Sequence, residues 1–222
     1  GFRRLVAPRH GRRPVNLSLN EVENLVRKAA RGAGLDPGRA DDLAAAAAVL
    51  ASHPLPVCAI VYRALTGDAG QSLTIAADGA HASCHATSAA HAGPSALDLL
   101  LGNPPGFEVT LDAVDEPLLF AALAVVAARR YAAHFTLAAG SDTVSITRDR
   151  RSDLTALGQA QGAQLVLRRL DATGARPSRT ISPACRYDPE KLSDDGVAGL
   201  ERLARMTYVP ASEDSRLKGA GA

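Results

Sequence analysis

The dipeptide Asp78-Gly79 constrains the fold of this chain more than any other feature of its sequence. It lies between two runs in which apolar and polar residues alternate, beginning near Leu73 and ending near Cys84. Asp-Gly is typical of two-residue hairpin turns, because both turn positions must tolerate positive φ. A turn at this point pairs Ile75 with Ala82. The sequence therefore predicts antiparallel sheet in the first half of the chain.

A second hairpin is predicted further along the chain. Gly140-Ser141 suits a type II′ turn, which needs glycine at its first central position, and it pairs Leu137 with Val144. Alternating apolar residues predict two more strands, at 107–111 and around 165–167.

Residues 17–65 follow the helical period instead. Ser18 and Glu21 have the spacing of a capping box, and Asp36-Pro37 combines an N-cap with a proline at the first helical position. These signals predict an N-terminal helical hairpin. Further helices are expected at 57–65, from Gly93-Pro94-Ser95 to Leu101, at 117–130, and from Asp194 or Asp195; a buried strand is the alternative at 57–65 and 117–130.

Together these elements predict an α+β fold. The N-terminal helical hairpin is followed by largely antiparallel β-hairpins with interspersed helices, and then by a C-terminal helix plus an extended tail. We expect residues 1–14 to form a basic disordered leader and residues 15–222 to form a single domain whose tail spans 207–222.

Three stretches of the chain carry a distinctive pattern. They read NLSLNEVE at 16–23, AGPSALDLL at 92–100 and TYVPASEDSRLKGAGA at 207–222. From about Val15 to the last residue, the chain resembles a bacterial family known as domain of unknown function 3726. The tail is the most specific part, because neither helix nor strand chemistry demands it. The resemblance implies a fold unit and carries no activity with it.

The charge distribution argues against a nucleic-acid-binding protein. The formal net charge is +2, but residues 1–14 contain five arginines and no acid, which leaves 20 basic against 23 acidic residues in the remainder. A formal charge of −3 is the opposite of what a phosphate backbone attracts. The three cysteines show no paired spacing, so we expect free thiols in a reducing cytoplasm. We expect no membrane span either, because no apolar run approaches about 18 residues.

Four residues of types that bind metals gather in a short stretch: His81, Cys84, His85 and His91. On a helix, positions 81, 84 and 85 would share a face and could bind zinc. On the predicted hairpin, Cys84 points to the opposite face from His81 and His85, which lie about 13 Å apart along the strand. We therefore expect no metal site, and a buried cysteine beside solvent-facing histidines.

The sequence contains partial motifs for nucleophilic catalysis and cofactor binding, but the neighbouring residues do not match what each motif requires. Ser95 follows Gly93-Pro94, but Leu97 stands where a nucleophile elbow needs its second glycine. We therefore interpret Ser95 as a residue at the start of a helix and not as a nucleophile. Cys58 near His53 could be an activated thiol, whereas a buried thiol is the ordinary reading. The glycines at 219 and 221 follow no strand and precede no helix, so no dinucleotide cofactor is expected.

The tail combines Ser212, Ser215, Arg216 and Lys218. Such a segment could fold over an anionic ligand, offering backbone N–H groups and a guanidinium fork. The alternative is a surface strap that pins Tyr208 and Val209 to the body of the protein. These four residues are our candidate ligand-binding residues.

Two functional hypotheses from different classes follow. The first is a non-catalytic ligand-binding or accessory component of small-molecule catabolism. The second is an enzyme on a small carboxylate or amide, in which Arg216 and Lys218 clamp the anion and one of His81, His85 or His91 acts as acid or base.

We predict that Arg216→Ala leaves the free energy of unfolding within about 0.5 kcal/mol of wild type, as for an ordinary surface site. The variant should lose binding of a small anionic ligand found by thermal-shift screening. A large loss of stability with intact ligand affinity would instead identify the tail as a structural strap.

Overall fold

The structure is a computed structural model of the chain. It describes residues 17–67, 74–75, 79–85, 88–148, 154, 157, 160, 162–170 and 194–207. The predicted leader, Asp78 and the candidate tail residues from Ser212 to Lys218 lie outside these described residues. Within the described part, no helix is long and apolar enough to cross a membrane.

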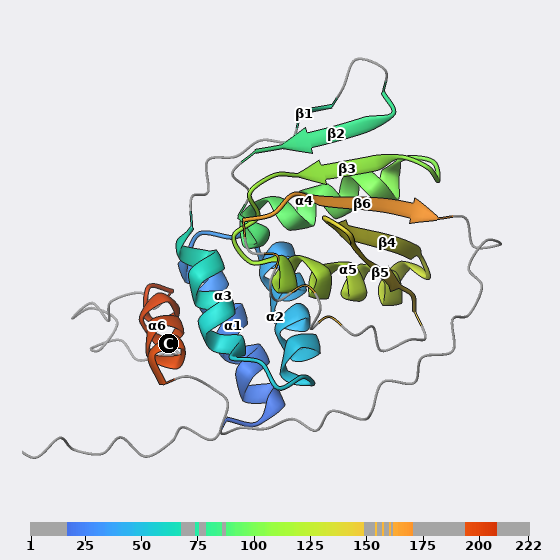
Figure 1. Cartoon of the computed structure of the whole chain (residues 1–222). Helices are drawn as coiled ribbons and strands as arrows, with labels where there is room; N and C mark the ends of the chain where they lie inside the picture. Colours follow the sequence, from blue (N-terminus) through green and yellow to red (C-terminus); the bar gives the residue numbers. More distant parts are fainter. Residues whose placement is uncertain are drawn as a thin grey trace, which may run out of the picture.

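The helices and strands alternate irregularly along the chain (Figure 1). The helices are α1 (Leu19–Gly32), α2 (Pro37–Ala51), α3 (Val57–Thr66), α4 (Ala89–Gly102), α5 (Pro117–Tyr131) and α6 (Asp194–Arg205). The strands are β1 (Thr74–Ile75), β2 (His81–Cys84), β3 (Glu108–Leu111), β4 (His134–Ala139), β5 (Asp142–Ile146) and β6 (Leu165–Leu170). The predicted α+β class is confirmed, and 57–65 and 117–130 are helices rather than strands.

The strands form one mixed sheet with the order β1-β2-β3-β6-β4-β5. Its pairs are antiparallel except for β2 and β3, which run parallel. A parallel pair needs a crossover connection, and α4 supplies it between β2 and β3. The hairpins predicted from sequence did not include this β2-α4-β3 unit. Its consequence is that β2 and β3 end at the same edge of the sheet.

The turn signals predicted the hairpin registers correctly. Ile75 pairs with Ala82, as expected for a turn at Asp78-Gly79, and Gly79 has φ +65°. Leu137 pairs with Val144 across Gly140, whose φ is +60°. Ala82 and Cys84 of β2 are buried, whereas His81 and His85, the residue after the strand, are exposed, so the predicted separation of Cys84 from the two histidines is confirmed.

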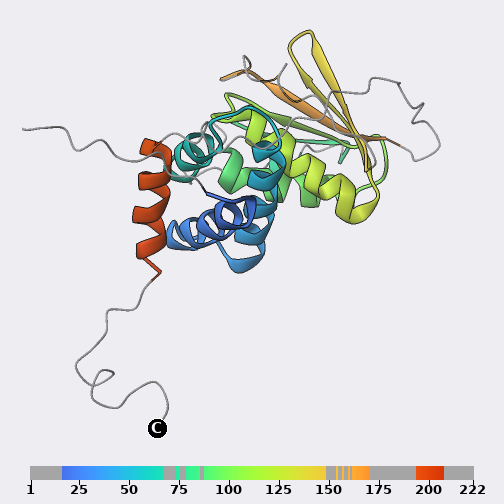
Figure 2. The same cartoon turned by 90° about the horizontal axis from the view of Figure 1, so that it is seen from below.

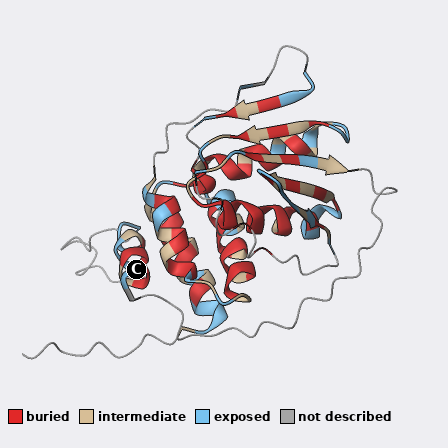
Figure 3. Cartoon of the chain, viewed as in Figure 1, coloured by how far each residue is buried: buried red, intermediate tan, exposed pale blue. Residues whose placement is uncertain are grey.

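The sheet is covered on one face. Figure 2 shows α4 and α5 against that face, with α1 and α2 beyond them. Along β4, residues alternate between half-buried and buried, and α5 is buried almost throughout (Figure 3). The core between the layers includes Phe120 on α5 and Phe135 on β4, both fully buried. Burial of the apolar side chains in this core is the main favourable contribution that holds the helices to the sheet.

The two N-terminal helices begin as their caps predict. Ser18 accepts a hydrogen bond from the Glu21 amide, and the Glu21 carboxylate accepts from the Ser18 amide at 2.7 Å. Asp36 accepts from the Arg39 amide at 3.0 Å, and Pro37 occupies the first helical position. These local hydrogen bonds satisfy amides that the helix itself cannot pair.

Helix α4 begins earlier than the sequence predicted. The expected start at Gly93-Pro94-Ser95 is wrong, because α4 starts at Ala89 and contains Pro94. A Cβ on Gly93 would lie 3.0 Å from Leu123, so this glycine allows α4 to pack closely on α5. That packing outweighs the cost of an internal proline. Ser95 therefore lies within α4 and not at its start, and its hydroxyl accepts a hydrogen bond from Arg39 at 3.0 Å.

Glycines allow α6 to dock on the other helices. A Cβ on Gly196 would lie 2.4 Å from the Ala59 backbone nitrogen, and one on Gly199 would lie 2.7 Å from the Tyr62 ring. On α1, a Cβ on Gly32 would meet the Leu203 carbonyl oxygen. Helix α6 thus lies against α3 and α1 at distances that only glycine permits.

We predict that Gly196→Ala lowers the free energy of unfolding by about 3 kcal/mol, at the upper end of overpacking costs, because the clash is with backbone that cannot rotate away. Urea unfolding of the full chain measures the change. Gly102→Ala at the end of α4 is the control, since its Cβ would meet nothing within 4 Å, and it should not destabilise. Equal stability of the two variants would show that α6 does not pack on α3 in this way.

Candidate functional site

The parallel pair β2 and β3 creates an edge where polar side chains gather. His85 directly follows β2, and Asp112 directly follows β3. The first turns of α4 and α5 and the last turn of α3 lie at this same end of the sheet (Figure 1). In open α/β sheets, ligands bind outside the carboxyl ends of parallel strands. We call this region, with Arg63, His85, Asp112, Asp115 and Glu116, the carboxyl-edge site.

Asp115 joins the beginnings of two helices. Its Oδ1 accepts hydrogen bonds from the Ala89 amide at 2.8 Å and from the Glu116 amide at 2.6 Å. The residue at the N-cap of α4 is Ser88, but its hydroxyl donates to the Ala64 carbonyl at 2.9 Å. Asp115 therefore takes the capping role from a distant point in the sequence.

The second oxygen of Asp115 is different. Oδ2 is buried and has no hydrogen-bond partner among the described residues. Gly67, just after α3, lies beside it: a Cβ on that glycine would approach Oδ2 to 2.9 Å. An unpaired buried carboxylate oxygen is costly, so it marks a place where a proton or a ligand could contribute a hydrogen bond.

Glu116 holds an arginine from another helix. The side chain of Glu116 is almost fully buried, and its Oε1 accepts a hydrogen bond from Arg63 Nε at 2.5 Å. About half of the Arg63 side chain, 51%, stays exposed. Its two terminal nitrogens make no hydrogen bond to a described side chain or backbone group. The buried carboxylate thus orients a guanidinium group whose outer edge faces solvent.

Burial shifts both neighbouring carboxyl groups in the same direction. It raises the pKa of Asp115, although the amides of Ala89 and Glu116, the Ser88 hydroxyl and the nearby His91 oppose the shift. It also raises the pKa of Glu116, although the hydrogen bond and the charge of Arg63 oppose it. Perturbed carboxyl groups of this kind gather at functional sites, and structural ion pairs produce them too.

His85 is held by a carboxylate at the same edge. Its Nδ1 lies 2.7 Å from Asp112 Oδ2, and Gln164 donates to the other oxygen of Asp112 at 2.6 Å. The His85 side chain is 81% exposed. In the neutral tautomer whose Nδ1 donates to Asp112, Nε2 would present a lone pair to solvent.

The structure separates the three candidate histidines. His85 and His91 lie at the carboxyl edge, where His91 is close enough to affect the Asp115 carboxyl group. His81 lies at the other end of β2. Among the described residues, no group of three or more His, Cys, Asp or Glu side chains could hold a metal ion. Cys58 is fully buried, and burial raises the pKa of its thiol to about 11, which argues against an activated nucleophile.

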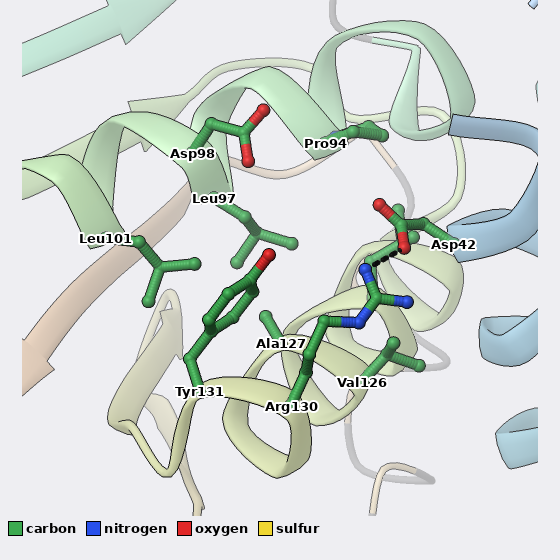
Figure 4. A pocket seen from close by; sticks show the side chains of 10 residues that line it. Asp42, Pro94, Leu97, Asp98, Leu101, Val126, Ala127, Arg130 and Tyr131 are labelled. Carbon is green, nitrogen blue, oxygen red and sulfur yellow. Dashed lines mark hydrogen bonds and ion pairs between the residues drawn. The ribbon is translucent and has the colours of Figure 1, made fainter. Parts of the chain in front are cut away.

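Two hollows in the described part of the molecule lie away from this edge. One pocket, between α4 and α5, has a volume of only about 20 Å³, and the Asp42–Arg130 ion pair crosses its rim at 2.5 Å (Figure 4). Tyr131 and Leu97 form part of its lining, and it has room for a water molecule only. A second hollow of about 560 Å³ lies among α1, α2 and α5 and shares Val126 and Arg130 with the first.

Sequence reasoning missed Arg63, Asp112, Asp115 and Glu116. A signal for three of them was present: acidic residues fill the short connection between a predicted strand and Pro117, which opens a helix. Such connections carry functional residues in parallel sheets. Arg63 has no comparable signal, because its partner is 53 residues away in the sequence.

Comparison with known proteins finds a similarity to one family over part of the chain, and no activity comes with it. The model of a family described as protein of unknown function (DUF3726) matches residues 17–91, which confirms the resemblance over that segment. The matched segment contains α1 to α3, β2 and the start of α4, and therefore Arg63 and His85. No curated protein and no solved structure matches the chain.

We predict that Asp115→Asn gains stability relative to wild type as pH rises. The raised pKa of Asp115 means that its folded-state stabilisation is complete below the unfolded value near 3.8 and is lost as pH rises through the folded value. Asparagine keeps an oxygen for the two amides and carries no charge. Urea unfolding at pH 4 and pH 7 measures the difference, with Asp98→Asn, an exposed position on α4, as the control. If the free energy of unfolding of wild type instead rose relative to that of Asp115→Asn with increasing pH, the pKa of Asp115 would not be raised.

Proposed function

We propose that this protein binds a small anionic molecule at the carboxyl-edge site, as a non-catalytic ligand-binding or accessory component of small-molecule catabolism. The observation that supports this best is the pair of Arg63 and Glu116, in which a buried carboxylate holds a half-exposed guanidinium group. An arginine oriented in this way offers a planar fork to a carboxylate or phosphate.

The energetics favour such a preorganised arginine. A free surface arginine loses rotamer entropy when it binds a ligand, whereas Arg63 is already restrained by its bond to Glu116. Glu116 also neutralises part of its charge, so binding would depend on geometry as well as attraction. The tail residues Ser212, Ser215, Arg216 and Lys218 stay a prediction as further ligand contacts.

A structural role competes with this proposal. Arg63 and Glu116 tie the end of α3 to the start of α5, and burial alone could account for the pair. Removing Arg63 entirely would leave Glu116 buried and unpaired, which typically costs 3–5 kcal/mol and would hide any effect on ligand binding. The test therefore needs a substitution that keeps the ion pair and removes the fork.

Arg63→Lys meets that need. We expect the free energy of unfolding of this variant to lie within about 1 kcal/mol of the wild-type value, because lysine can still pair with Glu116. The thermal shift produced by a small carboxylate or amide, found by screening wild type, should be lost. A ligand at 100 times its dissociation constant stabilises the folded state by about 2.7 kcal/mol, which such a screen detects readily. Arg205→Lys on α6, whose side chain is 74% exposed, is the matched control.

Two results would decide against the proposal. The first is a screen of small carboxylates and amides in which no compound shifts the melting temperature of wild type. The second is a shift of equal size in Arg63→Lys, because the anion would then bind without the fork.

A second candidate function is an enzyme at the same edge. The observation that favours it is the contact between His85 and Asp112, which resembles the orientation of a general base by a carboxylate. For a compound that passes the screen, NMR of the mixture would detect its conversion. Conversion that stops in His85→Gln and continues in His81→Gln would support catalysis; an unchanged compound would support binding alone.

A further inference from the structure

The hollow of about 560 Å³ among α1, α2 and α5 is separate from the carboxyl-edge site. We call it the α2 cleft. Its volume lies within the range of about 300–1,000 Å³ that is usual for small-molecule sites. Helix α2 packs against both α1 and α5, and Figures 1 and 2 show it between them. The two flanking helices form the walls of the cleft, and α2 forms its floor.

The floor of the cleft lies below its walls because the α2 side chains that line it are short. Ala45, Ala48 and Val49 follow helical spacing along one face of α2, and Ser52 is the C-cap of that helix. Ala45 and Ala48 are only partly buried, although their own helix is otherwise deep in the core. Longer side chains on both neighbouring helices rise beside these alanines, so a trough remains between them. Its floor is apolar apart from the Ser52 hydroxyl, which already donates to the Val49 carbonyl at 2.7 Å.

The two walls carry opposite charges. Glu23 lies on the α1 wall, and Arg129 and Arg130 lie on the α5 wall. Arg130 is paired with Asp42 at 2.5 Å, and this contact neutralises it. Within the part of the chain that the structure describes, neither the Glu23 nor the Arg129 side chain forms a hydrogen bond or an ion pair. One carboxylate and one guanidinium group are therefore available across an apolar floor.

We propose that the α2 cleft binds a small zwitterion with an aliphatic body, such as an aliphatic α-amino acid. Arg129 binds its carboxylate, Glu23 binds its ammonium group, and Ala45, Ala48 and Val49 contact its side chain. A bidentate guanidinium–carboxylate contact gives orientation as well as energy. The two charged contacts on opposite walls select a zwitterion over a simple anion or amine.

The experiment is a thermal-shift and calorimetric titration of the full chain. The probes are glycine, alanine, valine, leucine and isoleucine, each tested separately. The analogues 4-methylpentanoate, which lacks the amine, and 3-methylbutylamine, which lacks the carboxylate, test the two charges. We expect at least one amino acid to bind, and both analogues to bind at least tenfold more weakly than leucine.

Variants connect binding to the cleft. Arg129→Ala and Glu23→Gln should each weaken binding at least tenfold, and Ala48→Leu should abolish it by filling the floor. Arg205→Ala and Glu201→Gln on α6 are the matched controls and should bind as wild type does. Circular dichroism confirms that each variant is folded. Arg63→Lys should bind the amino acid normally, which separates this proposal from the carboxyl-edge site.

Three outcomes would overturn the proposal. One is the absence of binding by every amino acid in the panel. Another is binding that survives Ala48→Leu, because the ligand would then lie outside the cleft. The third is equal binding of leucine and 4-methylpentanoate, since the cleft would then recognise an anion and Glu23 would have no role.

Discussion

The carboxylate of Asp115 is the contact on which the arrangement of helices and sheet depends. One oxygen accepts from the first amide of α4 and from the Glu116 amide at the N-cap of α5. These two helices cover one face of the sheet, so a single side chain sets where both of them begin. Because α4 also connects β2 to β3, the same contact helps fix the parallel pair. This double role requires the carboxyl group of Asp115 to be buried, and burial raises its pKa.

Local chemistry determines the parts of the fold that sequence reasoning could predict. The capping box at Ser18, the N-cap at Asp36 and the turns at Asp78-Gly79 and Gly140-Ser141 act over a few residues, and their consequences were confirmed in the described part of the chain. The parallel pairing of β2 with β3 joins residues separated by a whole helix. No turn signal reports such a pairing. The start of α4 was mispredicted for a related reason, because the cap at its first amide comes from Asp115, 26 residues away.

The candidate site was less predictable than the fold. The reading of strand faces correctly separated Cys84 from His81 and His85, and this removed the most visible metal-binding hypothesis. It could not show that Asp112 would hold His85, because that contact forms only when β2 and β3 run parallel. Charged partners far apart in sequence become visible only once the layers are assembled. The chemistry at the carboxyl edge is therefore a property of the β2-α4-β3 unit rather than of any short motif.

Small residues have two opposite effects in the helical layer. The glycines of α6 bring its backbone against α3, where a Cβ would meet the Ala59 nitrogen at 2.4 Å. In that place a small residue closes the space between two helices and maximises dispersion contacts. On α2, Ala45 and Ala48 face outward between two helices that are held apart by other contacts, so the same smallness leaves space open. A larger apolar residue there would bury additional surface at about 25 cal/mol per Å² and would remain compatible with a helix. The chain forgoes that stabilisation at a hollow that Glu23 and Arg129 also line, and packing alone does not explain the loss.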